Sequence, residues 1–163
     1  MPTLYILVGV PGSGKTTYAK QRFPDIVRIG SDDLRKALFG TALTLRGHRR
    51  VHRILQRSAA VHLRKGKDVV IDCMNVTRTS RKVYFQLCPK GCRVEAIYLE
   101  TPLLQMIRNN RARTRQIPVI GIIWNRLRLR RPSYREGFDR IRVEPWKKRC
   151  IGRMEMRKNE PCR

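Results

Sequence analysis

Residues 4–20 read LYILVGVPGSGKTTYAK, and this stretch decides the fold. The apolar run at 4–8 is typical of a buried strand, glycines follow it at once, and a helical pattern begins at Lys15. A strand, a glycine-rich turn and a helix form the context in which G-x-x-x-x-G-K-T predicts a phosphate-binding loop. Glycines let several backbone N–H groups converge on one anion, and the helix N-terminus adds its dipole. We therefore expect the loop to bind the phosphates of a nucleoside triphosphate.

The residues of this loop have separate expected roles. Lys15 should reach the β- and γ-phosphates of ATP, and the hydroxyl of Thr16 should ligate Mg²⁺. Phosphate loops of this kind occur in motors, GTPases and small kinases, so the loop alone does not choose the reaction. The predicted ATP-binding residues are Gly9, Pro11, Gly12, Ser13, Gly14, Lys15, Thr16 and Thr17.

The chain of 163 residues is strongly basic, with 37 Lys and Arg against 12 Asp and Glu and a formal net charge of +25. The positive electrostatic field of such a chain favours binding of polyanions such as nucleic acid. The alternative explanation for the high charge is an adaptation for solubility. No stretch is apolar enough to span a membrane, and the run at 4–8 is not preceded by a basic leader region. Five cysteines, an odd number, favour reduced thiols. These features predict a cytoplasmic protein that does not bind a membrane.

Strands and helices alternate along the rest of the chain. Strands separated by helices pair in parallel and carry helices on both faces, so we expect an α/β domain with a parallel sheet of about five strands. This domain should cover residues 1–145, followed by a basic tail at 146–163. Beyond the first strand, the hydrophobic pattern predicts strands at 26–30, 68–73, 94–100 and 141–144, and helices at 32–39, 46–65, 77–87, 102–117 and from Pro118 to about 129.

Two acidic residues follow the second expected strand, in the sequence IGSDDLR at 29–35. Ligands bind at the carboxyl ends of parallel strands, so Asp32, Asp33 and Arg35 should lie beside the phosphate loop. A carboxylate there can accept a hydroxyl proton while an arginine binds an anionic acceptor. The alternative is that Ser31 or Asp32 only caps the following helix. We favour a catalytic carboxylate, because acids are scarce in so basic a chain.

The next two strands also end in polar motifs. IDCMNVTRTSR at 71–81 contains Asp72, which either holds Mg²⁺ through water or orients the first acid, and Asn75, which should shape the mouth of the site. RNNRARTRQIPV at 108–119 is rich in arginine, and Arg111 and Arg115 share one helix face at i, i+4. Arginines that close over a triphosphate neutralise charge on the γ-phosphoryl oxygens, whereas a solvated basic face is the alternative.

Five motifs in this order resemble those of polynucleotide 5′-hydroxyl kinases, of the phage, bacterial and animal end-healing type. The motifs are GVPGSGKTT, SDDLR, IDCMNVTRTSR, RNNRARTRQIPV and RPSYREGFDRI, and they span about residues 3–144. The resemblance implies a P-loop kinase fold with an arginine-bearing lid. It also implies transfer of the γ-phosphoryl of ATP to the 5′-OH of DNA or RNA.

On the donor side, the resemblance implies that Lys15 binds phosphate and Thr16 ligates the metal. Asp32 corresponds to the general base for the 5′-OH, and Arg111 and Arg115 look like the lid arginines. The predicted catalytic residues are therefore Lys15, Asp32, Arg111 and Arg115.

On the acceptor side, Arg35 matches the arginine that holds the 3′-phosphate of the acceptor nucleotide. Many relatives have Arg where Ser31 stands, so the contact near that position differs. The predicted acceptor-binding residues are Asp32, Arg35, Asp72 and Asn75.

The sequence thus predicts an ATP- and Mg²⁺-dependent polynucleotide 5′-hydroxyl kinase. The net charge and the basic helix at 46–65 favour a nucleic-acid acceptor. Two alternatives remain open at this point. One is a kinase of a small molecule or an aminoacyl-tRNA, and the other is a nucleic-acid-binding NTPase module that transfers no phosphoryl group to an acceptor.

Overall fold

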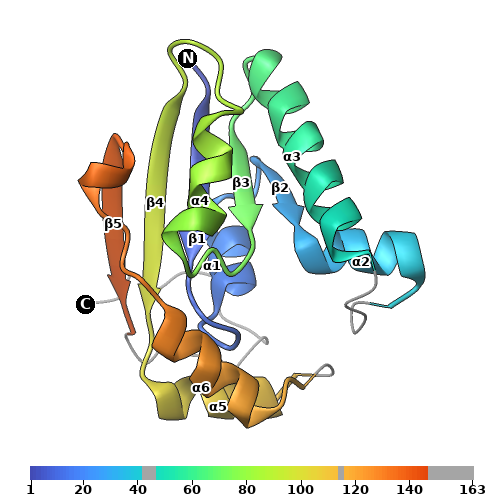
Figure 1. Ribbon diagram of the computed structural model, residues 1–163, viewed down its shortest axis with the longest axis vertical. Coiled ribbons are helices and arrows are strands. Elements are labelled where there is room, and N and C mark those ends of the chain that lie inside the picture. The colour runs from blue at the N-terminus through green and yellow to red at the C-terminus, as the bar shows by residue number, and fades with distance from the viewer. Residues whose placement is uncertain (42–46, 114–115, 147–163) are drawn as a thin grey trace, which may run out of the picture.

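A parallel sheet runs through the centre of the protein, whose computed structural model describes residues 1–41, 47–113 and 116–146 (Figure 1). Within these residues the sheet has five strands in the order β2-β3-β1-β4-β5, and every neighbouring pair is parallel. The expected α/β class and the parallel sheet of about five strands are confirmed. The strands are β1 Thr3–Val8, β2 Val27–Gly30, β3 Val69–Asp72, β4 Arg93–Glu100 and β5 Arg140–Pro145.

The helices lie close to where the hydrophobic pattern predicts them. They are α1 Lys15–Arg22, α2 Ser31–Phe39, α3 His48–Arg64, α4 Arg78–Phe85, α5 Leu103–Arg111 and α6 Val119–Arg128. A short 3-10 helix, η1 Tyr134–Glu136, was not predicted. At the start of α2 the N-cap position belongs to Gly30, so neither Ser31 nor Asp32 caps this helix. The expected basic tail lies almost wholly outside the described residues.

The two faces of the sheet pack against different helices, because successive side chains of a strand point to opposite faces. Leu4, Ile6 and Val8 of β1 belong to a larger core, whereas Leu7 belongs to a smaller one. The larger core includes Leu55, Ala59 and Leu63 of α3 and Tyr84 of α4, and the smaller includes Tyr18 and Ala19 of α1. Helices therefore cover both faces, as expected. The four residues of β3 are all buried, as in a central parallel strand.

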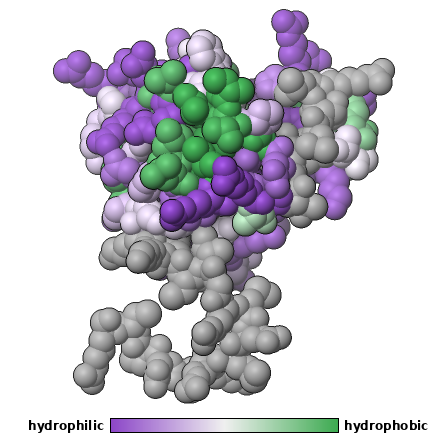
Figure 2. All heavy atoms as spheres, turned by 90° about the horizontal axis from the view of Figure 1, so that it is seen from below, coloured by the Kyte–Doolittle hydropathy of each residue, from purple (hydrophilic) through white to green (hydrophobic). Residues whose placement is uncertain are grey.

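The carboxyl ends of β1, β2 and β3 meet at one edge of the sheet, since Gly30 pairs with Asp72 in the ladder of β2 and β3. Figure 1 shows α5 and α6 lying across this lower end. Their outer side is apolar, and Figure 2 shows apolar side chains gathered on the underside of the molecule. Leu104, Ile120 and Leu127 are exposed there. No helix in the described part of the chain is both long and apolar enough to cross a bilayer.

Candidate active site

The loop between β1 and α1 closes around the side chain of Lys15. The ammonium donates hydrogen bonds to the carbonyl oxygens of Gly9 at 2.9 Å and Val10 at 3.0 Å. Burial lowers the pKa of Lys15 to about 8, the charge of Asp72 opposes this effect, and the charge of Arg113 adds to it. A lysine ammonium held inside a glycine-rich loop at the N-terminus of a helix suits the phosphates of a nucleotide.

Gly12 lets this loop touch α5 directly. Its φ of +82° lies in the left-handed region, and a Cβ there would come within 2.3 Å of the carbonyl oxygen of Met106. Side chains of the β4–α5 segment also bind the loop. Thr101 Oγ1 donates to the carbonyl of Ser13 at 3.1 Å, and Asn109 Nδ2 donates to that of Gly12 at 2.8 Å. Sequence reasoning missed Thr101 and Asn109, although Asn109 lies inside the RNNRARTRQIPV motif.

Asp32 and Asp33 differ in what binds them. Arg28 Nη2 pairs with Asp33 at 2.8 Å, and its Nη1 pairs with the buried Asp72 at 2.9 Å. Asp32 lies in the first turn of α2 with half of its side chain exposed, and its charge acts on Lys15. Arg28 was missed by sequence reasoning. It binds Asp33, whereas Asp32 pairs with Arg35.

Arg35 is more deeply placed than a residue at the open mouth would be. It is 7% exposed, its Nη1 donates to Asp32 at 3.1 Å, and its Nη2 lies 3.2 Å from His48 Nδ1. Because arginine can only donate, His48 Nδ1 is the acceptor of this contact. The Nε of Arg35 has no partner among the described residues. Arg35 therefore holds Asp32 in place and keeps one donor unused.

Asn75 is a buried residue that links the loop after β3 to β1. It is 4% exposed with a φ of 47°, and its Nδ2 donates to the carbonyl of Leu7 at 2.9 Å. It thus ties the loop after β3 to the end of β1. Its own carbonyl accepts a bond from Arg81 at 2.9 Å.

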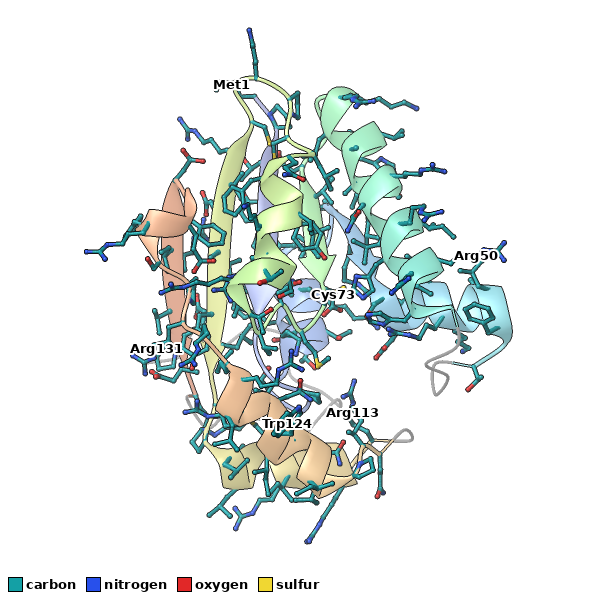
Figure 3. The ribbon with its side chains drawn as sticks, viewed as in Figure 1. Met1, Arg50, Cys73, Arg113, Trp124 and Arg131 are labelled. Carbon is teal, nitrogen blue, oxygen red and sulfur yellow. The ribbon has the colours of Figure 1, made fainter. Side chains whose placement is uncertain are left out.

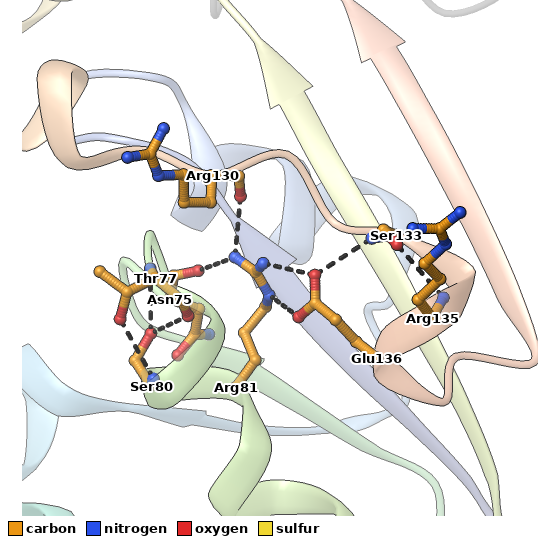
Figure 4. A network of polar contacts seen from close by, with 8 residues as sticks. All are labelled: Asn75, Thr77, Ser80, Arg81, Arg130, Ser133, Arg135 and Glu136. Carbon is orange, nitrogen blue, oxygen red and sulfur yellow. Dashed lines mark hydrogen bonds and ion pairs between the residues drawn. The ribbon is translucent and has the colours of Figure 1, made fainter.

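Arg81 is fully buried and joins three segments that are distant in the sequence (Figure 4). Its Nε and Nη2 donate to the two carboxylate oxygens of Glu136, at 2.8 and 2.7 Å. Its Nη1 also donates to the carbonyl of Arg130 at 3.0 Å. Bidentate pairs of this kind satisfy a buried charge at both partners. This network fixes the loop after β3 that carries Asn75.

The arginines expected in the lid are placed differently from one another. Arg111 is the exposed last residue of α5, and Arg115 lies outside the described residues. Arg113 is the described arginine of this segment whose charge acts on Lys15. Figure 3 shows it projecting from the α5–α6 connection toward the end of the sheet where Cys73 lies. Asn110 holds this connection closed, because its side chain both donates to and accepts from the backbone of Ile117.

The residues near the loop fit the expected Mg²⁺. Thr16 offers a hydroxyl in the first turn of α1, and Asp72 lies close enough to Lys15 for its carboxylate to raise the pKa of the ammonium. Hydroxyl and carboxylate oxygens are the ligands that Mg²⁺ prefers, with water completing its shell.

A phosphate loop on a parallel sheet, with a carboxylate and arginines at its mouth, defines a P-loop kinase domain. The AAA domain family matches residues 4–131, and the chain belongs to this family. The bifunctional polynucleotide phosphatase/kinase of Schizosaccharomyces pombe (strain 972 / ATCC 24843) is 27% identical over 150 residues, which cover 88% of this chain and 34% of that protein. The chain thus spans about a third of that relative's length.

Two solved structures share the fold. A chain in the structure of the Pnkp1/Rnl/Hen1 RNA repair complex superposes with a TM-score of 0.70 at 26% identity, covering 78% of this chain and 44% of that one. A gluconokinase from Sinorhizobium meliloti 1021 superposes with a TM-score of 0.57 at 20% identity, covering 88% and 82% of the two chains. The P-loop kinase fold and the resemblance to polynucleotide kinases are confirmed, and the gluconokinase shows that the same fold also occurs in a small-molecule kinase.

Proposed function

We propose that this protein is an ATP-dependent polynucleotide 5′-hydroxyl kinase, which transfers the γ-phosphoryl of ATP to the 5′-OH end of DNA or RNA. The observation that carries the proposal is the position of Asp32. Its carboxylate is half exposed, is held by Arg35, and its charge acts on Lys15, whereas the exposed Asp33 is bound by Arg28 and its charge does not appear among those that act on Lys15. An oriented, accessible carboxylate next to a phosphate loop is what a general base for a hydroxyl acceptor requires.

In the proposed reaction the donor is held by the loop. The backbone N–H groups of the loop and the ammonium of Lys15 bind the β- and γ-phosphates of ATP. Thr16, with Asp72 acting through water, would hold Mg²⁺, which when bound neutralises phosphate charge. Arg113, whose charge already acts on Lys15, supports a lid arginine that neutralises charge on the γ-phosphoryl oxygens.

On the acceptor side, Asp32 accepts the proton of the 5′-OH as its oxygen attacks the γ-phosphorus. The new bond joins the 5′-oxygen to phosphorus, the bond from phosphorus to the bridging oxygen breaks, and ADP leaves with that electron pair. Arg35 orients Asp32. The contact of Arg35 with the acceptor's 3′-phosphate stays a prediction, because the unpartnered Nε of Arg35 is itself buried.

A nucleic acid suits the surface better than a small metabolite does. The net charge of +25 favours a polyanion. The relative from Schizosaccharomyces pombe is a polynucleotide phosphatase/kinase, whereas the gluconokinase supports only the fold.

The test is transfer of labelled γ-phosphate from ATP to matched 5′-OH DNA and RNA oligonucleotides. A 5′-phosphorylated oligonucleotide of the same sequence is the control and should accept no label. Gluconate and a minus-acceptor reaction complete the set. Labelling of gluconate without labelling of either oligonucleotide would establish the small-molecule kinase instead. ATP hydrolysis that is unaffected by every acceptor would support the NTPase module.

A further inference from the structure

A cavity between the start of α4 and the end of α6 is lined by basic and hydroxyl side chains. It is open to solvent, has a volume of about 590 Å³, and is lined by Thr77, Arg78, Thr79, Arg128 and Arg130. No acidic side chain lines it, and in the described part of the chain none of its three guanidinium groups forms an ion pair. Three positive charges therefore converge on one cavity without compensation.

The position of Arg130 is fixed by the buried network around Arg81. Its backbone N–H donates to the carbonyl of Val76 at 2.8 Å, and its carbonyl accepts from Arg81 at 3.0 Å. Figure 4 shows the Arg130 side chain extending on the side of Thr77, away from Glu136. The protein thus uses a fully buried arginine to hold an exposed one beside the start of α4.

The placement of Arg78 works against the stability of its own helix. It is the first residue of α4, where the helix dipole favours an acid and disfavours a base. The capping box of Thr77 and Ser80 satisfies backbone donors there but brings no negative charge. A bound anion would relieve both this repulsion and that among the three arginines. Guanidinium groups match phosphate best, because they bind it through two parallel hydrogen bonds.

The cavity lies close in the chain to Asp72, at the carboxyl end of β3. Thr77 is five residues after Asp72, so the two residues are at most about 18 Å apart along even a fully extended chain. That span corresponds to only a few nucleotides of a single strand. The cavity is also lined by the end of α6, and none of its lining residues belongs to the phosphate loop.

We propose that this cavity binds a backbone phosphate of the acceptor strand, downstream of the nucleotide that carries the 5′-OH. The inference rests on the proposed function and deepens it, since it makes the preferred substrate a strand of several nucleotides and not a single nucleotide. The arginines Arg78, Arg128 and Arg130 bind the phosphate, and the Thr79 hydroxyl adds a neutral donor.

The experiment uses Arg78→Gln, Arg128→Gln, Arg130→Gln and the triple variant. Arg140→Gln is the matched control for the single variants. Arg140 is exposed and begins β5 at the opposite end of the sheet, and its substitution removes one positive charge, as each single variant does. Each protein is assayed with a 5′-OH oligonucleotide and with a nucleoside 3′-monophosphate. We expect KM for the oligonucleotide to rise about two- to fivefold for each arginine, as for an exposed ion pair. KM for the nucleoside 3′-monophosphate and both kcat values should stay unchanged, as should all values for Arg140→Gln.

Direct binding separates this inference from the proposed function. Fluorescence anisotropy with a labelled single-stranded oligonucleotide gives the slope of log K against log salt concentration. The slope should become shallower by about 0.7 for each phosphate that the triple variant no longer neutralises, and should not change in Arg140→Gln. If the wild-type protein transfers no phosphate but the triple variant shows this shallower slope, the nucleic-acid subsite stands and the proposed function fails. An unchanged slope, or equal KM increases for both acceptors, would overturn the subsite.

Discussion

Asp32 and Asp33 occupy adjacent positions, yet only one of them is placed to act as a base. Asp33 shares Arg28 with Asp72, while Asp32 lies beside Lys15. We expect Asp32→Asn to lower kcat by about 10² or more, the range for a lost general base, with ATP affinity unchanged. Asp33→Asn should cost much less. Steady-state kinetics with a 5′-OH oligonucleotide measures both, and the opposite ranking would move the base to Asp33.

The arginines of the lid can be ranked in the same way. The motif favours Arg111, but of these two exposed arginines Arg113 is the one whose charge acts on Lys15. We expect Arg113→Gln to lower kcat by about 10² or more, as for the loss of a donor to developing negative charge. Arg111→Gln, which removes the same charge two residues away, should have a smaller effect. A larger loss in Arg111→Gln would restore the ranking that the motif gives.

Among the elements, the contact between the phosphate loop and α5 rests on Gly12. A Cβ at this position meets the carbonyl of Met106 at 2.3 Å, and the backbone is left-handed. Gly66 is the matched control, since its φ of +73° is also left-handed but nothing lies within 4 Å of its Cβ position. Gly66→Ala should cost about 1–2 kcal/mol of unfolding free energy from backbone strain alone. Gly12→Ala should cost more and should also weaken ATP binding, as chemical denaturation and calorimetry would show. Equal stability losses would mean that the loop moves freely away from α5.

Local sequence signals predicted the elements and the phosphate loop well. The apolar runs of β1 and β3 and the glycines of the loop act over a few residues, so their meaning can be read directly from the chain. The 3-10 helix η1 is different, because the sequence RPSYREG around it carries turn residues and no hydrophobic period. Its importance comes from Glu136, whose partner Arg81 lies 55 positions away.

The supporting residues of the site could not be found in this way. Arg28 looks like any other arginine in a chain with 37 basic residues, and only the ladder of β2 and β3 brings it to Asp72. His48 is likewise an ordinary histidine until α2 and α3 pack together and place it against Arg35. A sequence can propose ligand-facing residues from their distinctive chemistry, but it does not reveal the residues that hold them by long-range contacts.

For the molecule as a whole, His52 should make stability depend on pH. Burial, His48 on its own helix and Arg35 from α2 lower the pKa of His52 to about 4, against 6.5 when unfolded. The unfolded chain therefore binds a proton first as the pH falls, so stability decreases between pH 6.5 and 4 and is unaffected by this group above 6.5. Thermal melting across this range should show wild type losing more stability than His52→Gln. If the melting temperatures of the two proteins fell by equal amounts between pH 6.5 and 4, the role of His52 would be contradicted.

The ion pair of Arg81 and Glu136 also sets how far the chain can be truncated from its C-terminal end without losing its folded structure. The family match ends at residue 131, five positions before Glu136 and before all of β5. A chain cut at that homology boundary would leave the Arg81 charge buried without its carboxylate, a loss of about 3–5 kcal/mol. We expect residues 1–131 to give no cooperative melting transition, whereas residues 1–146 should melt cooperatively by circular dichroism. During synthesis on the ribosome, the network of Arg81 that holds the loop carrying Asn75 would then remain incomplete until the segment around residue 136 has emerged from the exit tunnel.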